Sequence, residues 1–255
     1  MKIEKYIPGQ MGSAAHTALR NSIISVSERT DSHEVLLRHI DGAFAHECDE
    51  TFYVAHEDGR LISRHWMGWG KHKDAIGNWG YFFTDPDFRG QGIGGAVLKL
   101  WHEDFLSHND LPQCFLCTTG SQRITEYYGK FGFKPAIEGN TFGPLYMPVA
   151  NSPASFGEFC EKYYQPSEKL CVAPATMEFR HEIDCLLRFY FMSCGKEYAI
   201  GEFNGVDVAI LQAQDRTQML FSDDGHCVGW GVDGVYKMHP LYKDCSLNCK
   251  EAVSE

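Results

Sequence analysis

Residues 82–95 read Phe82-Phe83-Thr84-Asp85-Pro86-Asp87-Phe88-Arg89-Gly90-Gln91-Gly92-Ile93-Gly94-Gly95. The aromatic, β-prone start predicts the end of a strand, and Asp85-Pro86 predicts a sharp turn after it. Helix N-termini present unpaired N–H groups, and glycines let the backbone approach an anion closely. The stretch therefore predicts a strand, a phosphate-binding loop and the start of a helix, in that order.

The sequence on both sides of the loop supports this order. Upstream, residues 79–84 are aromatic and predict a strand. Downstream, Ile93, Val97, Trp101 and Phe105 recur every four residues, which predicts a helix to about Ser107 with one apolar face. A dinucleotide-binding turn would instead need G-x-G-x-x-G and an acidic residue about 20 positions later. That pattern is absent, so the loop is not of the dinucleotide-binding type.

Two motifs in this region resemble one family. Arg89-x-x-Gly92-x-Gly94 is similar to the acetyl-CoA-binding motif of the GNAT superfamily of N-acetyltransferases, in which the CoA pyrophosphate lies on the loop. About 35 residues later, residues 121–133 resemble the family's N-x-x-A-I-x-(F/L)-Y-x-K-x-G-F signature. Tyr128 falls on the tyrosine of that signature, whereas Ser121 replaces the usual asparagine and Gly129 loosens the helix.

The resemblance implies a fold, a cofactor and a set of site residues. The implied fold is α/β (α+β), a mixed and mostly antiparallel sheet flanked by helices. The implied cofactor is acetyl-CoA, with CoA as product, and the resemblance places the pantetheine arm along Phe83 and Thr84. The residues implied in cofactor binding are Phe83, Thr84, Arg89, Gly90, Gln91, Gly92, Ile93, Gly94, Gly95 and Ser121.

Tyr128 is the candidate acid for the leaving thiolate, because a phenol pKa of about 10 lies near that of a thiol. Its alternative role is aromatic packing under the cofactor. A backbone N–H near Phe83 would face the thioester oxygen, again by resemblance. The general base stays open among six titratable residues, any of which can equally be a packing or surface residue: His65, His72, Asp85, Glu47, Asp49 and Glu50.

Composition limits the classes of partner. The chain has 255 residues, 44% of them hydrophobic, and a net charge of −11, which indicates a globular protein and argues against a nucleic-acid-binding surface. No apolar run approaches the ~18 residues of a membrane span, and the N-terminus shows no signal-peptide pattern, so we expect a cytoplasmic protein. Glu47, Asp49 and Glu50 would favour a cationic amine if they line the acceptor site.

Ten cysteines do not predict a metal site. Cys114 and Cys117 form a C-x-x-C on a predicted strand, where residues i and i+3 point to opposite faces. Cys245 and Cys249 have no histidine after them at ligand spacing. Reduced thiols and no bound metal are therefore expected.

The chain divides into two predicted parts at the polar segment 151–155. Residues 1–150 carry the GNAT-like order, with strands predicted at 2–7, 51–55, 61–69, 79–84, 113–118 and 141–149. Helices are predicted at 13–22, 34–44 and 93–107, and a further one follows residue 121. Asp58-Gly59 predicts the turn of a hairpin.

Residues 151–255 form a smaller predicted α+β domain without a recognised family. Helices are predicted at 156–164 and 176–192, followed by a hairpin of strands 198–203 and 206–211 around Asn204-Gly205. A second hairpin, of strands 219–222 and 227–232, surrounds residues 223–225. This part is too short for a complete second acetyltransferase, and a degenerate GNAT-like copy remains an alternative.

The leading functional hypothesis is an acetyl-CoA-dependent N-acetyltransferase that acetylates a primary amine directly in a ternary complex. The first alternative is a non-catalytic acyl-CoA-binding sensor or interaction module. The second keeps the enzyme but gives the donor a longer acyl chain. The C-terminal part would shape the acceptor site or mediate a homodimer.

Overall fold

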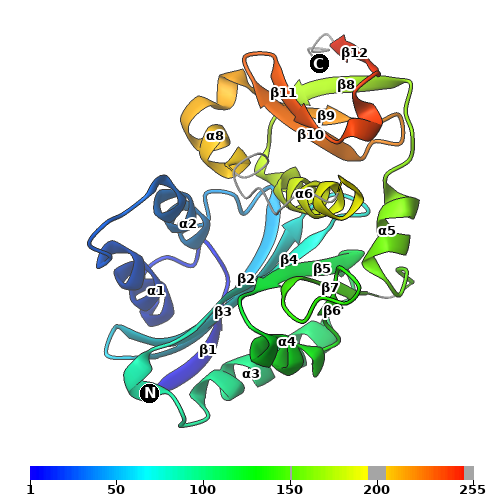
Figure 1. The fold of residues 1–255 in the computed structure, drawn as a ribbon. Coiled ribbons are helices and arrows are strands. Elements are labelled where there is room, and N and C mark those ends of the chain that lie inside the picture. Colours follow the sequence, from blue (N-terminus) through cyan, green and yellow to red (C-terminus); the bar gives the residue numbers. More distant parts are fainter. Residues whose placement is uncertain (150, 195–204, 250–255) are drawn as a thin grey trace.

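The computed structural model describes residues 1–149, 151–194 and 205–249 (Figure 1). A seven-stranded sheet occupies the N-terminal part, with strand order β1-β2-β3-β4-β5-β7-β6. Its strands are β1 (Lys2–Tyr6), β2 (Cys48–Glu57), β3 (Arg60–Gly70), β4 (Gly77–Thr84), β5 (Cys114–Thr119), β6 (Lys134–Pro135) and β7 (Gly143–Pro148). Only the β4–β5 pair is parallel. The mixed, mostly antiparallel fold class predicted from sequence is thus confirmed.

Helices cover both faces of this sheet. They are α1 (Ala14–Ile24), α2 (Asp31–Asp41), α3 (Ile93–Ser107) and α4 (Gln122–Gly129). Each face of the sheet has its own hydrophobic core, because successive side chains of β2 point to opposite faces. Phe52 belongs to the same core as Leu19 of α1, whereas Tyr53 belongs to the same core as Trp101 of α3. Asp58 and Gly59 have φ of 47° and 77°, as a two-residue turn between β2 and β3 requires. The predicted hairpin at this position is confirmed.

The C-terminal part forms a second, five-stranded sheet with order β11-β10-β9-β8-β12. The strands are β8 (Lys169–Pro174), β9 (Thr217–Phe221), β10 (Cys227–Val232), β11 (Val235–Met238) and β12 (Ser246–Cys249), and the helices are α5 (Phe156–Tyr163), α6 (Arg180–Cys194) and α8 (Val206–Ala213). The predicted α+β character of this part is confirmed. The predictions contained no counterpart of β8, β11 or β12.

The topology of the second sheet repeats the first half of the first sheet. In the first, β1 is followed by α1 and α2 and then by the antiparallel β2, β3 and β4. In the second, β8 is followed by α6 and α8 and then by the antiparallel β9, β10 and β11. A short 3₁₀ helix follows in both cases, at Pro86–Phe88 after β4 and at Pro240–Tyr242 after β11. This repetition favours the alternative that residues 151–255 are a partial copy of the fold.

One predicted hairpin is wrong in the half that the structure describes. Residues 206–211 were predicted as a strand, but Val206–Ala213 is the helix α8. Its start is Gly205, with φ of 96°, and its buried residues Val206 and Ile210 lie four positions apart on one helix face. The partner strand predicted at 198–203 lies outside the described residues.

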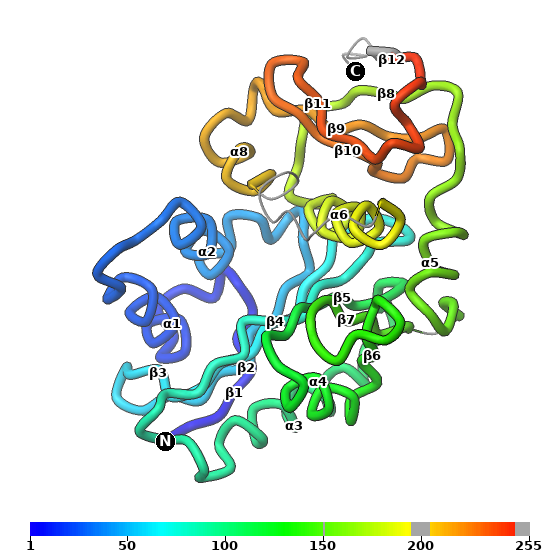
Figure 2. Tube along the Cα trace, viewed as in Figure 1, coloured from blue at the N-terminus to red at the C-terminus, as the bar shows by residue number. Residues whose placement is uncertain are grey.

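The two sheets share a hydrophobic core, and α6 lies between them (Figure 2). Leu116 and Tyr146 of the first sheet belong to the same buried cluster as Leu186 of α6 and Leu220 of β9. Polar contacts add to this packing, since the backbone N–H of Ile76 donates to Glu182 of α6 at 2.9 Å. The C-terminal part therefore packs directly against the sheet that carries the glycine loop.

Candidate functional site

The glycine loop connects β4 to α3. The backbone N–H of Asp87 donates to the Asp85 carboxylate at 3.0 Å, which caps the 3₁₀ turn after β4. Gly90 and Gly92 then take φ of 77° and 78°, a region that favours glycine, and Gly92 is the residue before the first turn of α3. A Cβ atom at either glycine would have nothing within 4 Å. The loop thus needs these glycines for backbone conformation, and the space beside them is open.

Side chains hold the loop without covering it. Arg89 Nε donates to the carbonyl of Thr84 at 3.0 Å, and Gln91 Nε2 donates to the carbonyl of Asp87 at 3.2 Å. Arg60 of β3 donates to the carboxylates of both Asp85 and Asp87. The first-turn N–H groups of a helix have no partner within the helix. Those of α3 meet the open side of the loop, where the helix dipole favours an anion.

Gly94 sets the distance between α3 and β4. A Cβ atom there would lie 2.8 Å from Thr84 Oγ1 and 3.0 Å from the ring of Phe82, which is closer than normal contact. Gly94 therefore allows the helix to approach the strand, a role different from that of Gly92. Gly95 faces Tyr127, whose hydroxyl would lie 4.0 Å from an added Cβ.

β4 and β5 separate after a short paired segment. Their register contains only the pairs Gly77–Phe115 and Asn78–Leu116. Beyond this point β4 continues to Thr84, and its residues 80–84 are half-buried or exposed although the strand lies inside the sheet. Thr118 of β5 is exposed as well. We call the space between residues 79–84 of β4 and residues 117–119 of β5 the strand gap.

A β-bulge lies in the β4 side of the strand gap. The β3–β4 register shifts between Arg64 and Trp66, and Tyr81 within the bulge has φ of 53°, which is uncommon for a residue other than glycine. The Tyr81 ring meets the Trp66 ring edge-on with centroids 5.6 Å apart. Phe83 is 37% exposed, and the Arg64 guanidinium lies over its ring, 5.6 Å from the centroid.

We call the end of the strand gap next to the last β4–β5 pair, Asn78–Leu116, its closed end. Tyr128 lies there. Its ring meets that of Trp79 edge-on at 4.3 Å, and Trp79 follows the last paired residue of β4. Only 7% of Tyr128 is exposed, and burial raises the pKa of its phenol. The hydroxyl is therefore protonated at neutral pH, but the raised pKa makes it a weaker acid than the match with a thiol pKa assumes. Ser121 precedes α4, and its carbonyl accepts from the Thr125 N–H.

The two histidines considered as bases have different surroundings. His65 is fully buried among the rings of Tyr53, Trp79 and Trp101, and burial lowers its pKa well below the ordinary value. It is therefore a neutral core histidine. His72 lies after β3, where its Nε2 is 3.0 Å from Glu182 of α6.

The four carboxylates considered as bases are all engaged. Asp85 caps the 3₁₀ turn and pairs with Arg60, Asp49 pairs with Lys71 at 3.4 Å, and Glu47 accepts from the Met177 N–H at 2.6 Å. Glu50 accepts from Trp66 Nε1 at 3.2 Å and lies 2.7 Å from His39 Nδ1. Burial acts to raise the pKa of Glu50, but His39, Arg180 and Trp66 together hold it below the ordinary value.

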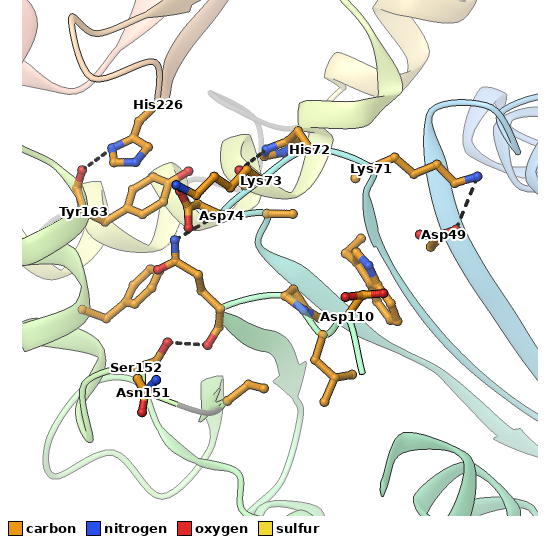
Figure 3. Close-up of a pocket in the computed structure, with 18 of the residues that line it drawn as sticks. Asp49, Lys71, His72, Lys73, Asp74, Asp110, Asn151, Ser152, Tyr163 and His226 are labelled. Atoms are coloured by element: carbon orange, nitrogen blue, oxygen red, sulfur yellow. Dashed lines mark hydrogen bonds and ion pairs between the residues drawn. The ribbon is translucent and has the colours of Figure 1, made fainter. Parts of the chain in front are cut away.

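A cavity of about 790 Å³ lies at the opposite end of the first sheet from the loop (Figure 3). Lys71, Lys73 and Lys162 line it together with Asp49, Asp74 and Asp110, so its charges are mixed. Figure 3 shows Lys71 turned to Asp49 and His226 turned to the carbonyl of Tyr163. None of the glycine-loop residues lines this cavity. A second cavity, of about 540 Å³, lies beside Phe83 and Asp85 near the start of the loop.

Residues 48–135 match the family model described as an acetyltransferase (GNAT) domain. The matched range includes the strand gap, the glycine loop and Tyr128. Residues 48–135 therefore carry a GNAT acetyltransferase domain, as the two motifs predicted. The match ends before the second sheet, whose family is not identified.

Solved structures from several organisms are similar to this chain. Escherichia coli ElaA is 16% identical, with 58% of this chain and 99% of that chain covered and a TM-score of 0.39. An acyl-CoA N-acyltransferase from Pseudomonas aeruginosa is 17% identical (57% and 99% covered, TM-score 0.37). PaiA N-acetyltransferase from Thermoplasma acidophilum, in complex with coenzyme A, is 14% identical (58% and 100% covered, TM-score 0.36). No curated protein matches the chain in sequence.

Within residues 1–149, 151–194 and 205–249, no helix has the length and apolar character needed to cross a membrane. In the same residues, no group of three or more His, Cys, Asp or Glu side chains is placed to hold a metal ion. Cys114 and Cys117 belong to different hydrophobic clusters, which confirms that they face opposite sides of β5.

Proposed function

We propose that this protein is an acetyl-CoA-dependent N-acetyltransferase that transfers the acetyl group directly to a primary amine in a ternary complex. The observation that carries the proposal is the combination of an open, left-handed glycine at the N-terminus of α3 with the strand gap beside it. The glycine at the helix N-terminus suits a pyrophosphate. The strand gap leaves one edge of β4 unpaired beyond Asn78. The family match is consistent with both.

In this proposal the cofactor runs from the loop into the strand gap. Residues Arg89–Gly95 bind the pyrophosphate, mainly through backbone N–H groups, and the pantetheine arm passes Phe83 and Thr84. From Thr84 to Asn78 the strand advances by six residue steps, or about 20 Å at the usual rise per residue. An extended arm that starts at the loop would therefore bring the thioester toward the closed end of the gap, where Tyr128 lies.

The chemistry then follows from the positions of the groups. An amine of pKa about 10.4 is protonated at pH 7 and must lose a proton before its nitrogen attacks the thioester carbon. The new C–N bond forms as the C–S bond breaks, and a backbone N–H near Phe83 stabilises the oxyanion in between. Tyr128 gives its proton to the departing thiolate. The amine approaches from the α2 and α6 side, because buried residues of α3 and α4 fill the other face.

We also propose that the chain is organised as residues 1–150, which form the acetyltransferase domain, and residues 151–255, which form an accessory domain. The support is that each part contains its own sheet. In this proposal the accessory domain shapes the acceptor side, and the support is that α6 contacts β4 and β5 through Asp184 and Arg188.

Thiol release from acetyl-CoA tests the proposed function. The purified protein is incubated with acetyl-CoA and a panel of amines, and free CoA is measured with a thiol reagent after subtraction of the signal from the protein's own cysteines. We expect release that depends on one class of amine. Binding of CoA without release from any amine, including peptide amines, would instead favour the acyl-CoA sensor. Rates of CoA release from acetyl-CoA and from longer acyl-CoA donors are compared to test whether acetyl is the preferred acyl group.

A further inference from the structure

A buried arginine of α6 lies where β4 and β5 separate. Arg188 is 4% exposed, and its Nη2 donates to Thr118 Oγ1 of β5 at 3.2 Å. Its Nη1 donates to the carbonyl of Asp184, one helical turn earlier, at 2.8 Å. The Asp184 carboxylate lies 3.9 Å from the guanidinium and accepts from Asn78 Nδ2 of β4 at 2.6 Å.

These four residues link the two strands through one helix. We call Asn78, Asp184, Arg188 and Thr118 the polar bridge. Asn78 belongs to the last β4–β5 pair, and its partner there is Leu116, two residues before Thr118. The bridge therefore spans the strands at the point where their direct pairing stops.

The polar bridge and Tyr128 lie on opposite faces of the sheet. Side chains alternate along β4, so Asn78 faces α6 whereas Trp79 faces Tyr128. The same alternation on β5 turns Thr118 toward Arg188 and Cys117 toward the cluster that contains Tyr128. The closed end of the strand gap thus has a phenol on one face and a guanidinium on the other.

Packing of α6 alone does not require this arginine. Leu186 and Leu187 already bury α6 in the shared core, and Glu182 anchors it to the start of β4. Removing a guanidinium from water costs several kcal/mol unless partners compensate it. The buried guanidinium is compensated by acceptors on α6 and β5, so it holds the helix to the strand at the point where β4 and β5 separate.

We propose that the polar bridge sets the width of the strand gap at its closed end, and that Arg188 is a positioning residue for the acyl end of acyl-CoA. This inference rests on the proposed function, because it assumes that acyl-CoA occupies the gap. It makes the C-terminal part a component of the active centre, although the two sequence motifs both lie in residues 1–150.

Calorimetry with two ligands tests the inference separately from turnover. Acetyl-CoA reaches the closed end of the gap, whereas adenosine 3′,5′-bisphosphate contains only the end of the cofactor near the loop. We expect Arg188→Met to raise the Kd of acetyl-CoA about tenfold, the loss expected for hydrogen bonds from a charged group, and to leave the Kd of the bisphosphate unchanged. Arg188→Lys should retain part of the affinity, since it keeps the charge but loses the fork of donors.

A second variant tests the inference without removing the buried arginine, in case Arg188→Met does not fold. Thr118 is exposed, so Thr118→Val removes the acceptor of Arg188 Nη2 without opening a cavity, and we expect it to weaken acetyl-CoA binding about threefold. Arg216→Met is the matched control, because Arg216 is an exposed arginine paired with Asp233 at 2.8 Å on the second sheet. It should bind both ligands as the wild type does.

The outcomes separate the two proposals. Wild-type protein that binds neither ligand would overturn the proposed function and the inference with it. Wild-type binding that Arg188→Met and Thr118→Val both leave unchanged would overturn the inference alone. Equal weakening of both ligands by Arg188→Met would also overturn it, because that result indicates a general structural effect.

Discussion

At Gly92 the backbone, and no side chain, forms the proposed binding surface. Gly92→Glu adds bulk and negative charge where the pyrophosphate would lie, and a non-glycine residue at φ of 78° costs about 1 kcal/mol. We expect the variant to fold and to lose measurable CoA binding in calorimetry.

Gly234→Glu provides the matched control for this prediction. Gly234 has φ of 79° and open space around an added Cβ, as Gly92 has, but lies in the turn between β10 and β11. It should bind CoA normally. Unchanged affinity in Gly92→Glu would show that the loop does not hold the cofactor.

Tyr128 differs from a core tyrosine only if its hydroxyl takes part in the reaction. Tyr128→Phe keeps the edge-on contact with Trp79 and removes the proposed proton donor. We expect turnover to fall by about 10²-fold, the usual contribution of a general acid, with little change in acetyl-CoA affinity. Steady-state kinetics together with calorimetry measure the two effects, and equal turnover in the variant would make Tyr128 a packing residue.

At the residue scale, the sequence was most informative at positions where the backbone conformation requires a particular residue type. A run of closely spaced glycines restricts a loop to few conformations, so Gly90 and Gly92 could be identified without a structure. Side-chain partners were less accessible. The acidic residues Glu47, Asp49 and Glu50 are close in sequence, yet each contacts a different part of the fold. His65 of β3 is enclosed by rings from two other strands and a helix.

Among the elements, α2, β2 and α6 meet around one buried carboxylate. Glu50 of β2 contacts His39 of α2, and Arg180 of α6 lies 3.0 Å from the other nitrogen of His39. We expect Glu50→Gln to lower the free energy of unfolding by about 2 kcal/mol at pH 7, because hydrogen bonds to a charged group are lost.

The effect of Glu50→Gln should depend on pH. The folded-state pKa of Glu50 lies below its ordinary value near 4.5, so its stabilisation is complete above that pH and is lost as the pH falls through the folded-state pKa. Denaturant unfolding of wild type and variant should therefore converge in acid. A difference that stays constant down to pH 3 would contradict this account.

Elements with a clear period were predicted, and those without one were not. The stripe from Ile93 to Phe105 gives α3, and the aromatic strand before the loop gives β4. In contrast, residues 206–211 are rich in β-branched residues, and their packing as α8 against the second sheet outweighs that weak propensity. Arg188 in a largely apolar helical run is the one sequence sign of the polar bridge. The bridge residues on β4 and β5 lie 70 and more residues away from their partners on α6.

At the scale of the whole molecule, the proposed domain boundary lies between the two sheets, but one hydrophobic core contains residues from both sides of it. Removal of residues 151–255 would expose Ile76, Leu116 and Tyr146, which are at most 1% exposed in the full chain. We expect a fragment of residues 1–149 to aggregate or to melt at a lower temperature than the full chain, because a contiguous apolar surface becomes solvent-exposed. Size-exclusion chromatography and thermal unfolding measure this. A monomeric fragment with the full chain's melting temperature would show that the domains are independent.

The sequence by itself determined the class of domain, the order of its elements and the position of the glycine loop. These depend on local features, namely side-chain periodicity and the conformational range of glycine, which act over a few residues. The tertiary structure decided the parting of β4 and β5, the burial of His65 and the placement of α6 across the strand gap. Those features arise from contacts between residues far apart in the chain, whose pairing no local pattern specifies.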